Sequence, residues 1–350
     1  MRARTRMLTA TSSLLTALSA AFLCTPAAPA LAQPSVESFY KGRVVELVVG
    51  TLPGGGYDLY GRLIARYLGR HIPGQPTVIV RNMPGAGHLR MANWLYNAAP
   101  RDGTVLATTP QSIAIEQALG TDGVQYDAGK FTYVGRAAPV VEVTYVWHTS
   151  KTQSIADART RETVMGGSGA ASPTVFYLKA LNMLAGTKFR VVAGFRGVSE
   201  TELAVQREEV EGGTKAWASF KIDNAEWLRE KKAKIILQYA LERAPDLPDV
   251  PMMAELGLDA RATTALKLFA SGNAMGRSIF ATPGIPPERA AALRKAFMDT
   301  ISDPELVAFT RERNIDLGPA LSGEGLAQIV METLSVPPET AAEVKKARGD

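Results

Sequence analysis

Hydrophobic positions along the chain follow two spacings that alternate with each other. Short continuous apolar runs are typical of buried strands, and apolar residues three and four positions apart are typical of one helix face. Pro/Gly turns or polar loops separate most of these segments. The pattern predicts strands over residues 44–49, 77–81, 105–109, 140–147, 162–165, 189–192, 234–239 and 278–281. It predicts helices over residues 58–70, 88–96, 174–184, 199–206, 286–301, 303–313, 323–334 and 337–347.

The order of these segments predicts an α/β fold with two lobes. Strands and helices alternate, which favours βαβ units and parallel or mixed sheets. The alternation restarts after the strand over 140–147, and the apolar stretch 278–281 is suited to carry the chain back. We therefore expect a first lobe from residues 33–140 and 276–350, a second lobe from 141–275, and a cleft between them. Ligands in open α/β sheets lie beyond the carboxyl ends of the strands, so the loops there are the candidates.

The first 32 residues have the pattern of a secretory signal peptide. Three arginines precede a weakly apolar stretch over 8–23, and Ala30 and Ala32 give the small-x-small pattern of a cleavage site. The apolar run is short and is followed by prolines, which disfavours an uncleaved membrane anchor. Phe22 and Leu23 precede Cys24 where a lipoprotein signal has a small residue, which disfavours a lipid anchor. We expect an exported chain that begins near Gln33.

Removal of this segment changes the charge and the cysteine content. The 39 basic residues become 36 against 34 acidic residues, so the net charge falls from +5 to +2. The basic character is thus partly a targeting signal, and a nucleic-acid partner is not indicated. Cys24 is the one cysteine of the chain, so its removal excludes disulfides, thiolate nucleophiles and cysteine metal sites. We expect no metal and no cofactor.

The loop after the first predicted strand has the composition of an anion site. It reads Thr-Leu-Pro-Gly-Gly-Gly-Tyr-Asp over residues 51–58 and leads into a helix. Glycines let backbone N–H groups converge, and the free N–H groups and dipole of a helix start favour an anion. Asp58 is placed to cap that helix. The spacing matches neither the phosphate-binding loop nor the dinucleotide fingerprint, and a plain turn without a ligand stays an alternative.

Similar loops follow other predicted strands. Residues 82–88 and 166–173 are small-residue loops at predicted helix starts, and neutral hydrogen-bonding groups follow the third strand. Backbone N–H groups and waters hold a carboxylate without a buried Lys or Arg. Arg196 and Lys215 are candidates to add charge, with solvated surface as their alternative, and Trp217 is a candidate cleft residue with core packing as its alternative. The candidate ligand-binding residues are Pro53, Gly54, Gly55, Gly56, Tyr57, Asp58, Asn82, Gly85, Ala86, Gly87, Thr109, Gln111, Ser168, Gly169, Ala170, Ser172, Arg196 and Trp217.

Three motifs of the first lobe, in this order and spacing, resemble the Bug-type extracytoplasmic solute receptors of tripartite tricarboxylate transporters. The family's P-G-G-x-x-D followed by Ala or Gly with Arg is similar to residues 53–58 and 61–62, with one extra glycine or a one-residue offset. Its N-x-P-G-A-G is similar to residues 82–87, and its A-P-x-D-G-x-x-L to residues 99–106. The second lobe matches less closely, because Arg207 and Glu208 flank a position where Gly is usual.

The resemblance implies a two-lobed flytrap fold of the periplasmic-binding-protein type II class and a periplasmic location. It implies a small organic anion, a carboxylate in that family, held largely by backbone and water. It implies delivery to membrane permease subunits by a monomeric receptor that is not an enzyme. The departures in the second lobe and at His88 and Arg90 leave the ligand open.

Two other functions remain as alternatives. An exported hydrolase would use Ser168, because Gly166-x-Ser168-x-Ala170 comes one residue short of the nucleophile elbow. Its base would be one of three scattered histidines, His71, His88 or His148, for which surface or capping roles are the default. Scattered histidines without cysteine also form no spaced metal ligand set. A ligand-sensing receptor for a signalling partner would have the same fold and cleft.

Overall fold

The computed structural model describes residues 35–169, 172–240 and 243–348. The predicted signal peptide over 1–32 lies outside these residues. The strands are β1 Val44–Val49, β2 Thr77–Asn82, β3 Val105–Thr108, β4 Thr132–Arg136, β5 Glu142–Trp147, β6 Thr163–Gly167, β7 Phe189–Ala193, β8 Gly212–Ala216, β9 Ala233–Tyr239, β10 Ser278–Ala281 and β11 Leu321–Ser322. The α-helices are α1 Val36–Tyr40, α2 Gly56–His71, α3 Leu89–Asn97, α4 Ile113–Ala118, α5 Ile155–Thr160, α6 Pro173–Ala185, α7 Val198–Gln206, α8 Trp217–Asp223, α9 Ala225–Arg229, α10 Ala260–Met275, α11 Pro287–Ile301, α12 Pro304–Glu312, α13 Gly323–Leu334 and α14 Pro338–Arg348.

The first sheet has six strands in the order β11-β4-β10-β3-β1-β2. β1 runs parallel to β2 and β3, so the carboxyl ends of these three strands meet at one edge. β10 runs antiparallel to β3 and β4. The return of the chain over 278–281 therefore adds a strand to the middle of the first sheet, as its apolar composition requires.

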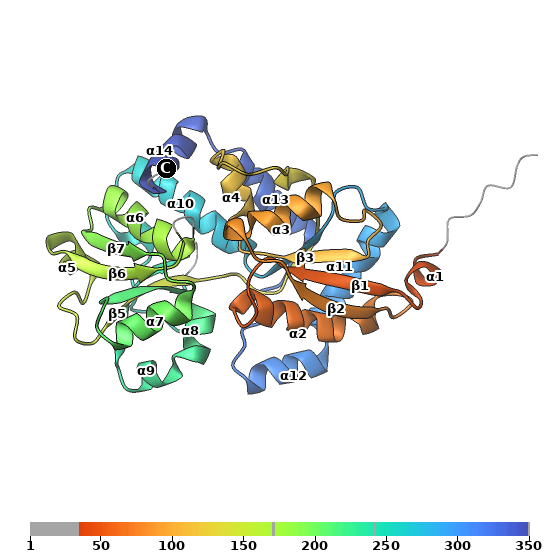
Figure 1. The fold of residues 1–350 in the computed structure, drawn as a ribbon, viewed down its shortest axis with the longest axis horizontal. Coiled ribbons are helices and arrows are strands. Elements are labelled where there is room, and N and C mark those ends of the chain that lie inside the picture. Colours follow the sequence, from red (N-terminus) through yellow and green to blue (C-terminus); the bar gives the residue numbers. More distant parts are fainter. Residues whose placement is uncertain (1–34, 170–171, 241–242, 349–350) are drawn as a thin grey trace, which may run out of the picture. The chain divides into compact units, whose positions relative to one another are not determined.

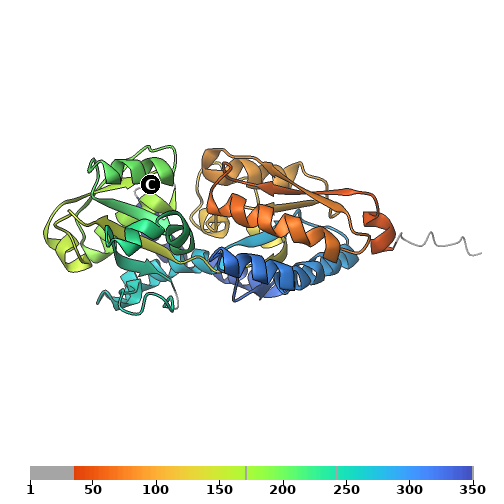
Figure 2. The same ribbon diagram turned by 90° about the horizontal axis from the view of Figure 1, so that it is seen from below.

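Helices cover both faces of this sheet (Figure 1). One face packs on α2 and α11, whose buried residues share a core that includes Val45, Leu47 and Phe297. The other face packs on α3 and α13 through a second core that includes Val48 and Phe280. Figure 2 shows the blue helices of the last quarter of the chain beside the orange helix α2, where α11 contacts it.

The second sheet has five strands in the order β7-β6-β8-β5-β9. β6 runs parallel to β7 and β8, and β5 runs antiparallel to β8 and β9. Helices α5, α6, α10 and α14 share the core of one face, and α7, α8 and α9 share the core of the other. The last helix, α14, contacts α6 and α10, so the end of the chain reaches the helices of the second sheet.

Two elements lack a clear hydrophobic pattern for identifiable reasons. β8 has the sequence Gly-Gly-Thr-Lys-Ala, and a Cβ on Gly212 would lie 2.1 Å from the carbonyl oxygen of Tyr145. A strand composed this way has no apolar signature. α10 is rich in Ala and Thr, and its buried positions are spread around the helix instead of forming one stripe. Among the described residues no helix has the length and hydrophobicity needed to cross a membrane.

Candidate functional site

The carboxyl edge of the first sheet brings three of the predicted loops together. Val49 at the end of β1 is in register with Asn82 of β2 and Thr108 of β3. The next residues stay in contact, because the Gly50 N–H donates to the carbonyl of Thr108 at 2.9 Å and the Met83 N–H to that of Val49 at 2.8 Å. The loops that follow the three strands are therefore neighbours, as the parallel order predicts.

A buried carboxylate shapes the first loop. Asp58 accepts hydrogen bonds from the Gly54 N–H at 3.0 Å, from Arg62 Nε at 2.9 Å and from Asn82 Nδ2 at 2.8 Å. The N-cap of α2 is Gly55, so Asp58 acts from within the first turn by reaching back to the loop. Burial acts to raise its pKa, but the three hydrogen bonds together hold the pKa below the ordinary value. The sequence prediction of a cap is thus refined to a loop brace.

The glycines leave space in front of the start of α2. Gly54 has a φ of +87°, which favours glycine, whereas Gly55 has an ordinary φ of −88°. A Cβ on Gly55 would meet no atom within 4 Å, so this glycine is not needed for packing. Pro53, Gly54 and Gly55 are exposed. The backbone at Pro53, Gly54 and Gly55, just before the helix start, is therefore accessible.

The second and third loops carry strained backbone and an unpaired hydroxyl. Gly85, Ala86 and His88 all have positive φ, and two of them are not glycine. His88 is buried, with its Nε2 at 3.1 Å from Ser112 Oγ, so it is neither a surface residue nor a side-chain cap. Thr109 Oγ1 is buried and has no hydrogen-bond partner among the described residues. An unpaired buried hydroxyl at a strand end is a place for a ligand or a water.

A chain of buried hydrogen bonds leads from these loops to the second sheet. The Gln111 N–H donates to Tyr57 Oη at 3.1 Å, and Gln111 Nε2 donates to Asn273 Oδ1 at 2.9 Å. Tyr177 Oη of α6 donates to the same oxygen at 2.8 Å, and Asn273 Nδ2 donates to the carbonyl of Tyr239 at 2.6 Å. Two predicted site residues, Tyr57 and Gln111, therefore connect the loop at α2 to α6, α10 and β9.

The loop after β6 is held by hydroxyl groups. Ser168 Oγ lies 2.8 Å from Ser172 Oγ and 3.0 Å from Thr174 Oγ1, and the Ser168 N–H donates to Thr174 Oγ1 at 2.9 Å. Ser172 is the N-cap residue of α6, although its hydroxyl makes no cap hydrogen bond. A Cβ on Gly169 would meet nothing within 4 Å. Ala170, also predicted for the site, lies outside the described residues.

The structure pairs the side chains of three further candidates with neighbouring acidic residues. The Arg196 side chain is 90% exposed and pairs with Glu200 at 3.5 Å. Lys215 is buried, not on the surface, and its Nζ pairs with Glu202 at 2.7 Å and Asp223 at 2.8 Å. Trp217 is buried, and its Nε1 donates to Asp246 at 2.9 Å. Their charges and indole group are therefore occupied by neighbours on the second sheet.

Two charged residues that sequence reasoning missed lie among the predicted ones. Glu142 opens β5 and is 7% exposed, and Arg277 precedes β10 and is 4% exposed. Burial raises the pKa of Glu142 to about 7, against the opposing effects of Arg277, Gln111 and Lys215. A single acid in the apolar run Val-Val-Glu-Val-Thr-Tyr-Val-Trp is a signal that was available in the sequence, because such runs are buried on both faces.

Comparisons with known proteins agree with this architecture. No protein-family model matches the chain. It is 27% identical over 248 residues to the UPF0065 protein in the gbd 5' region of Cupriavidus necator, covering 68% of this chain and 72% of that protein. It is 25% identical over 307 residues to a UPF0065 protein of Bordetella bronchiseptica, covering 84% of each.

Solved structures share the fold over nearly their whole length. The periplasmic binding protein BugD has a TM-score of 0.66 at 18% identity, covering 88% of this chain and 98% of BugD. MatC from Rhodopseudomonas palustris, with bound malate, has a TM-score of 0.65 at 22% identity and covers 86% and 99%. R. palustris Rpa4515, with adipate, has a TM-score of 0.66 at 21% identity and covers 88% and 97%. The chain resembles the Bug-type solute-binding proteins. The predicted resemblance and the two-lobed α/β fold class are confirmed.

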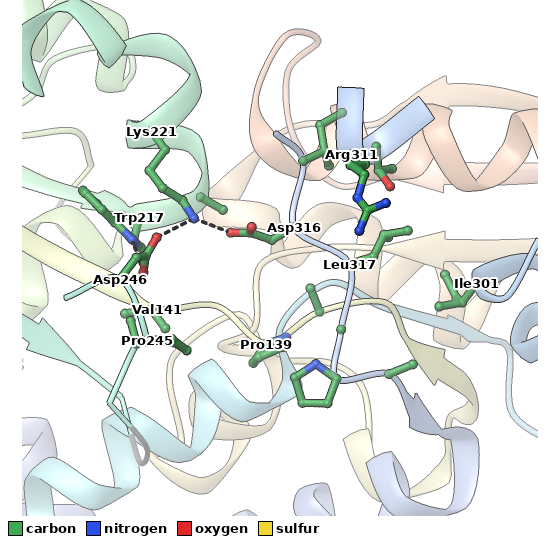
Figure 3. A pocket seen from close by; sticks show the side chains of 18 of the residues that line it. Pro139, Val141, Trp217, Lys221, Pro245, Asp246, Ile301, Arg311, Asp316 and Leu317 are labelled. Atoms are coloured by element: carbon green, nitrogen blue, oxygen red, sulfur yellow. Dashed lines mark hydrogen bonds and ion pairs between the residues drawn. The ribbon is translucent and has the colours of Figure 1, made fainter. Parts of the chain in front are cut away.

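The structure also contains a cavity of about 850 Å³, which Figure 3 shows from close by. Lys221 of α8 spans it, with Nζ 2.8 Å from Asp246 and 3.0 Å from Asp316. Of the predicted site residues, Trp217 lines this cavity, whereas the glycine loops do not. Its walls come from α8 and from the segments 138–141, 243–246, 301–311 and 315–320, and the residues that line it include none from the loops after β1, β2, β3 or β6.

The chemistry of the described residues suits binding. The hydrogen bonds recorded for Ser168 go to Ser172 and Thr174, while His71 pairs with Asp303 and His88 with Ser112. The third histidine, His148, stacks beside Trp147. No group of three or more His, Cys, Asp or Glu in the described part of the chain is arranged to hold a metal ion. The loops thus offer hydrogen-bond donors, and no histidine is placed to activate Ser168.

Proposed function

We propose that the protein is a periplasmic solute receptor that binds a small organic carboxylate and delivers it to a tripartite tricarboxylate-type membrane permease. The observation that carries this proposal is the loop at the start of α2. Gly54 and Gly55 put no side chain in front of the helix start, Asp58 braces the loop, and a Cβ at Gly55 would stand in open space. A braced, accessible helix start without a histidine or metal beside it binds an anion and transfers no proton.

The comparisons support the ligand class and the location. The relatives with known structure include a periplasmic binding protein and proteins holding malate and adipate, both of which are carboxylates. The exported location also follows from the signal-peptide pattern in the sequence. By the same analogy the protein acts as a monomer without a cofactor, is not an enzyme, and has a permease as its partner.

We assign the ligand site to predicted residues of the loops that follow β1, β2, β3 and β6. The first-lobe set is Pro53, Gly54, Gly55, Gly56, Tyr57, Asn82, Gly85, Ala86, Gly87, Thr109 and Gln111. The second-lobe set is Ser168, Gly169, Ala170 and Ser172. Asp58 serves as a brace, and Arg196 and Trp217 lie outside the set. The lobes proposed are 33–140 with 276–350, and 141–275, with α14 packed across onto α6.

The test is direct binding of a carboxylate panel to the purified protein by titration calorimetry, with Gly55→Leu as the blocking variant. The added side chain has room in the unliganded protein, so the variant should fold, but it would fill the space in front of α2. The matched control is Ala225→Leu, which adds bulk at the exposed first residue of α9. We expect binding to be lost in Gly55→Leu and kept in the control. No binding by any carboxylate, or equal binding by both variants, would overturn the proposal.

A further inference from the structure

Arg277 places a buried positive charge at the start of α2. Its guanidinium carbon lies 4.2 Å from the centre of the Tyr57 ring and 5.2 Å from that of Tyr60. Its Nη2 lies 2.7 Å from the position that a Cβ on Gly56 would occupy, and Ser219 Oγ of α8 lies 2.9 Å from the same position. The guanidinium therefore contacts the first residue of α2, at the place where a residue from the second sheet also arrives.

A cation at this place is unfavourable unless an anion joins it. The N-terminus of a helix carries partial positive charge, so a guanidinium there adds to a charge of the same sign. Aromatic faces at Tyr57 and Tyr60 offset part of this cost. Two positive features that converge on one point are the arrangement found at sites for carboxylates and phosphates.

Glu142 is another buried charge of this region. Ion pairs within 4.0 Å in the described residues include neither Glu142 nor Arg277. The other nearby cation, Lys215, is already paired with Glu202 and Asp223. Arg277 lies over Tyr57 and Glu142 stands opposite Tyr239, and hydrogen bonds through Gln111 and Asn273 connect these two tyrosines. Buried charges held apart in this way are costly, and a ligand that contacts both would remove the cost.

We propose that the ligand is an aminocarboxylate, with its carboxylate against Arg277 and the start of α2 and its ammonium group against Glu142. This inference rests on the proposed receptor function and narrows its ligand class. Glu142 stands opposite Tyr239 in the register of β5 and β9, and the Tyr177 ring lies 4.3 Å from the Tyr239 ring. Gln111 and Asn273 connect Tyr57 to Tyr177 by hydrogen bonds, so tyrosines of α2, α6 and β9 gather in this region. Rings around a carboxylate favour an organic ammonium ion over its neutral analogue.

The same geometry rejects plain dicarboxylates. A second carboxylate in place of the ammonium group would face the ionised Glu142 across a buried space, and like charges there are strongly unfavourable. The pair of charges therefore recognises the two ends of the ligand separately. Arg277 and the helix start require one carboxylate, and Glu142 requires a hydrogen-bond donor at the other position.

The experiment compares amino acids with their des-amino carboxylates. The probes are the twenty standard amino acids and the matched pairs alanine and propionate, glutamate and glutarate, and phenylalanine and 3-phenylpropionate, each titrated calorimetrically at pH 8. Burial raises the pKa of Glu142 to about 7, so its carboxyl is ionised at this pH. We expect the wild-type protein to bind at least one amino acid at least tenfold more tightly than its des-amino carboxylate.

Three variants separate the roles of the two charges. Glu142→Gln keeps the shape of the side chain and should abolish the preference for the amino acid. Arg277→Gln should weaken both members of a pair, and Arg196→Gln, whose side chain is 90% exposed, is the matched control that should change neither. Thermal melting verifies that each variant is folded, and the absence of a preference in the wild-type protein would overturn the assignment without any variant.

The outcomes distinguish this inference from the receptor function. Carboxylates that bind the wild-type protein as tightly as their amino acids, or an unchanged preference in folded Glu142→Gln, would overturn the aminocarboxylate assignment and leave the receptor proposal standing. Folded wild-type protein that binds neither class would overturn both. An amino-acid preference that disappears in Glu142→Gln would establish the assignment.

Discussion

The loop after β1 and the loop after β6 have the same design and different supports. Each lies between a strand of a parallel pair and the start of a long helix. Each also contains a glycine, Gly55 or Gly169, at which an added Cβ would meet no atom within 4 Å. The first loop is braced by the carboxylate of Asp58, with bonds from Gly54, Arg62 and Asn82. The second is held by hydroxyl groups, from Ser168, Ser172 and Thr174.

In the proposed receptor, this difference would let two similar loops serve one ligand in different ways. Hydrogen bonds to a charged group are about twice as strong as neutral ones, so the first loop is the more rigid of the two. A rigid loop holds its backbone donors ready for a carboxylate. Hydroxyl groups rotate and act as donors or acceptors, so the second loop is able to adapt to whatever the carboxylate carries. The departures from the Bug-type motifs also fall mainly in the second half of the chain.

The largest effect is expected from removing the brace of the first loop. Asp58→Ala should lower the free energy of unfolding by about 2–3 kcal/mol, because it deletes the hydrogen bonds that Gly54, Arg62 and Asn82 donate to a buried charged group. Carboxylate binding should be lost as well. Urea denaturation and calorimetric titration measure the two effects.

The control for this variant is Asp58→Asn, which keeps an acceptor for Gly54 without the charge and should cost less. An Asp58→Ala protein with wild-type stability and affinity would show that the first loop holds itself without the brace. The proposed contrast between the loops would then fail.

The next-largest effect tests which glycine of the loop after β6, Gly167 or Gly169, is required by packing. A Cβ on Gly167 would lie 2.6 Å from Val175 Cγ2 and 2.9 Å from the carbonyl oxygen of Thr174, whereas one on Gly169 would meet nothing within 4 Å. Gly167→Ala should therefore destabilise the protein by about 1–3 kcal/mol. Gly169→Ala should change its stability by less than about 0.5 kcal/mol. If Gly167→Ala and Gly169→Ala changed the free energy of unfolding in urea equally, the loop would shift freely, and packing would not require glycine at position 167.

A smaller effect is expected when the pH is lowered, and only the loop after β1 should respond. The pKa of Asp58 is held below its ordinary value of 3.8 in the folded protein, so the unfolded chain binds a proton first as the pH falls. The stabilisation is complete above that value and is lost as the pH falls through the lower, folded pKa. The Gly54 amide resonance should titrate with a midpoint below 3.8, because its N–H donates to Asp58. The Gly169 resonance should not move, and a shared titration of both amides would contradict the contrast.

Much of the fold follows from the sequence, because its strands are apolar and its loops carry turn residues. β10 begins and ends at the predicted residues 278 and 281, and α2, α6 and α13 start within two residues of their predictions. β8 was missed because close contact with β5 requires glycine there, which removes the hydrophobic signal. The brace at Asp58 and the exposure of Arg196 depend on neighbours that local pattern does not reveal.

Glu142 and Arg277 show the limit of prediction from sequence more clearly. Glu142 stands in an apolar run and Arg277 beside a predicted strand, and neither belongs to a recognisable motif. Their proposed role depends on the fold, which connects residues 135 positions apart through Tyr57, Gln111, Asn273 and Tyr239. Motif reasoning finds the backbone donors shared by similar proteins, whereas the side chains that select one ligand are recognised only when distant segments are placed together.

The smallest effect is expected from a change at Ser168, in the loop after β6. Ser168→Ala removes two hydroxyl contacts, at 2.8 Å and 3.0 Å, but keeps the bond from its backbone N–H to Thr174. The free energy of unfolding should fall by about 1 kcal/mol or less, since the remaining hydroxyls of Ser172 and Thr174 still bond each other at 2.6 Å. Affinity should change modestly and differently for different carboxylates, because an adaptable loop contributes to selection more than to the common binding energy.

Calorimetric titration of Ser168→Ala beside Thr160→Ala, which removes an exposed hydroxyl on α5, measures this effect against a matched control. Ester hydrolysis by the wild-type protein that disappears in Ser168→Ala would instead make Ser168 a nucleophile and contradict the receptor proposal.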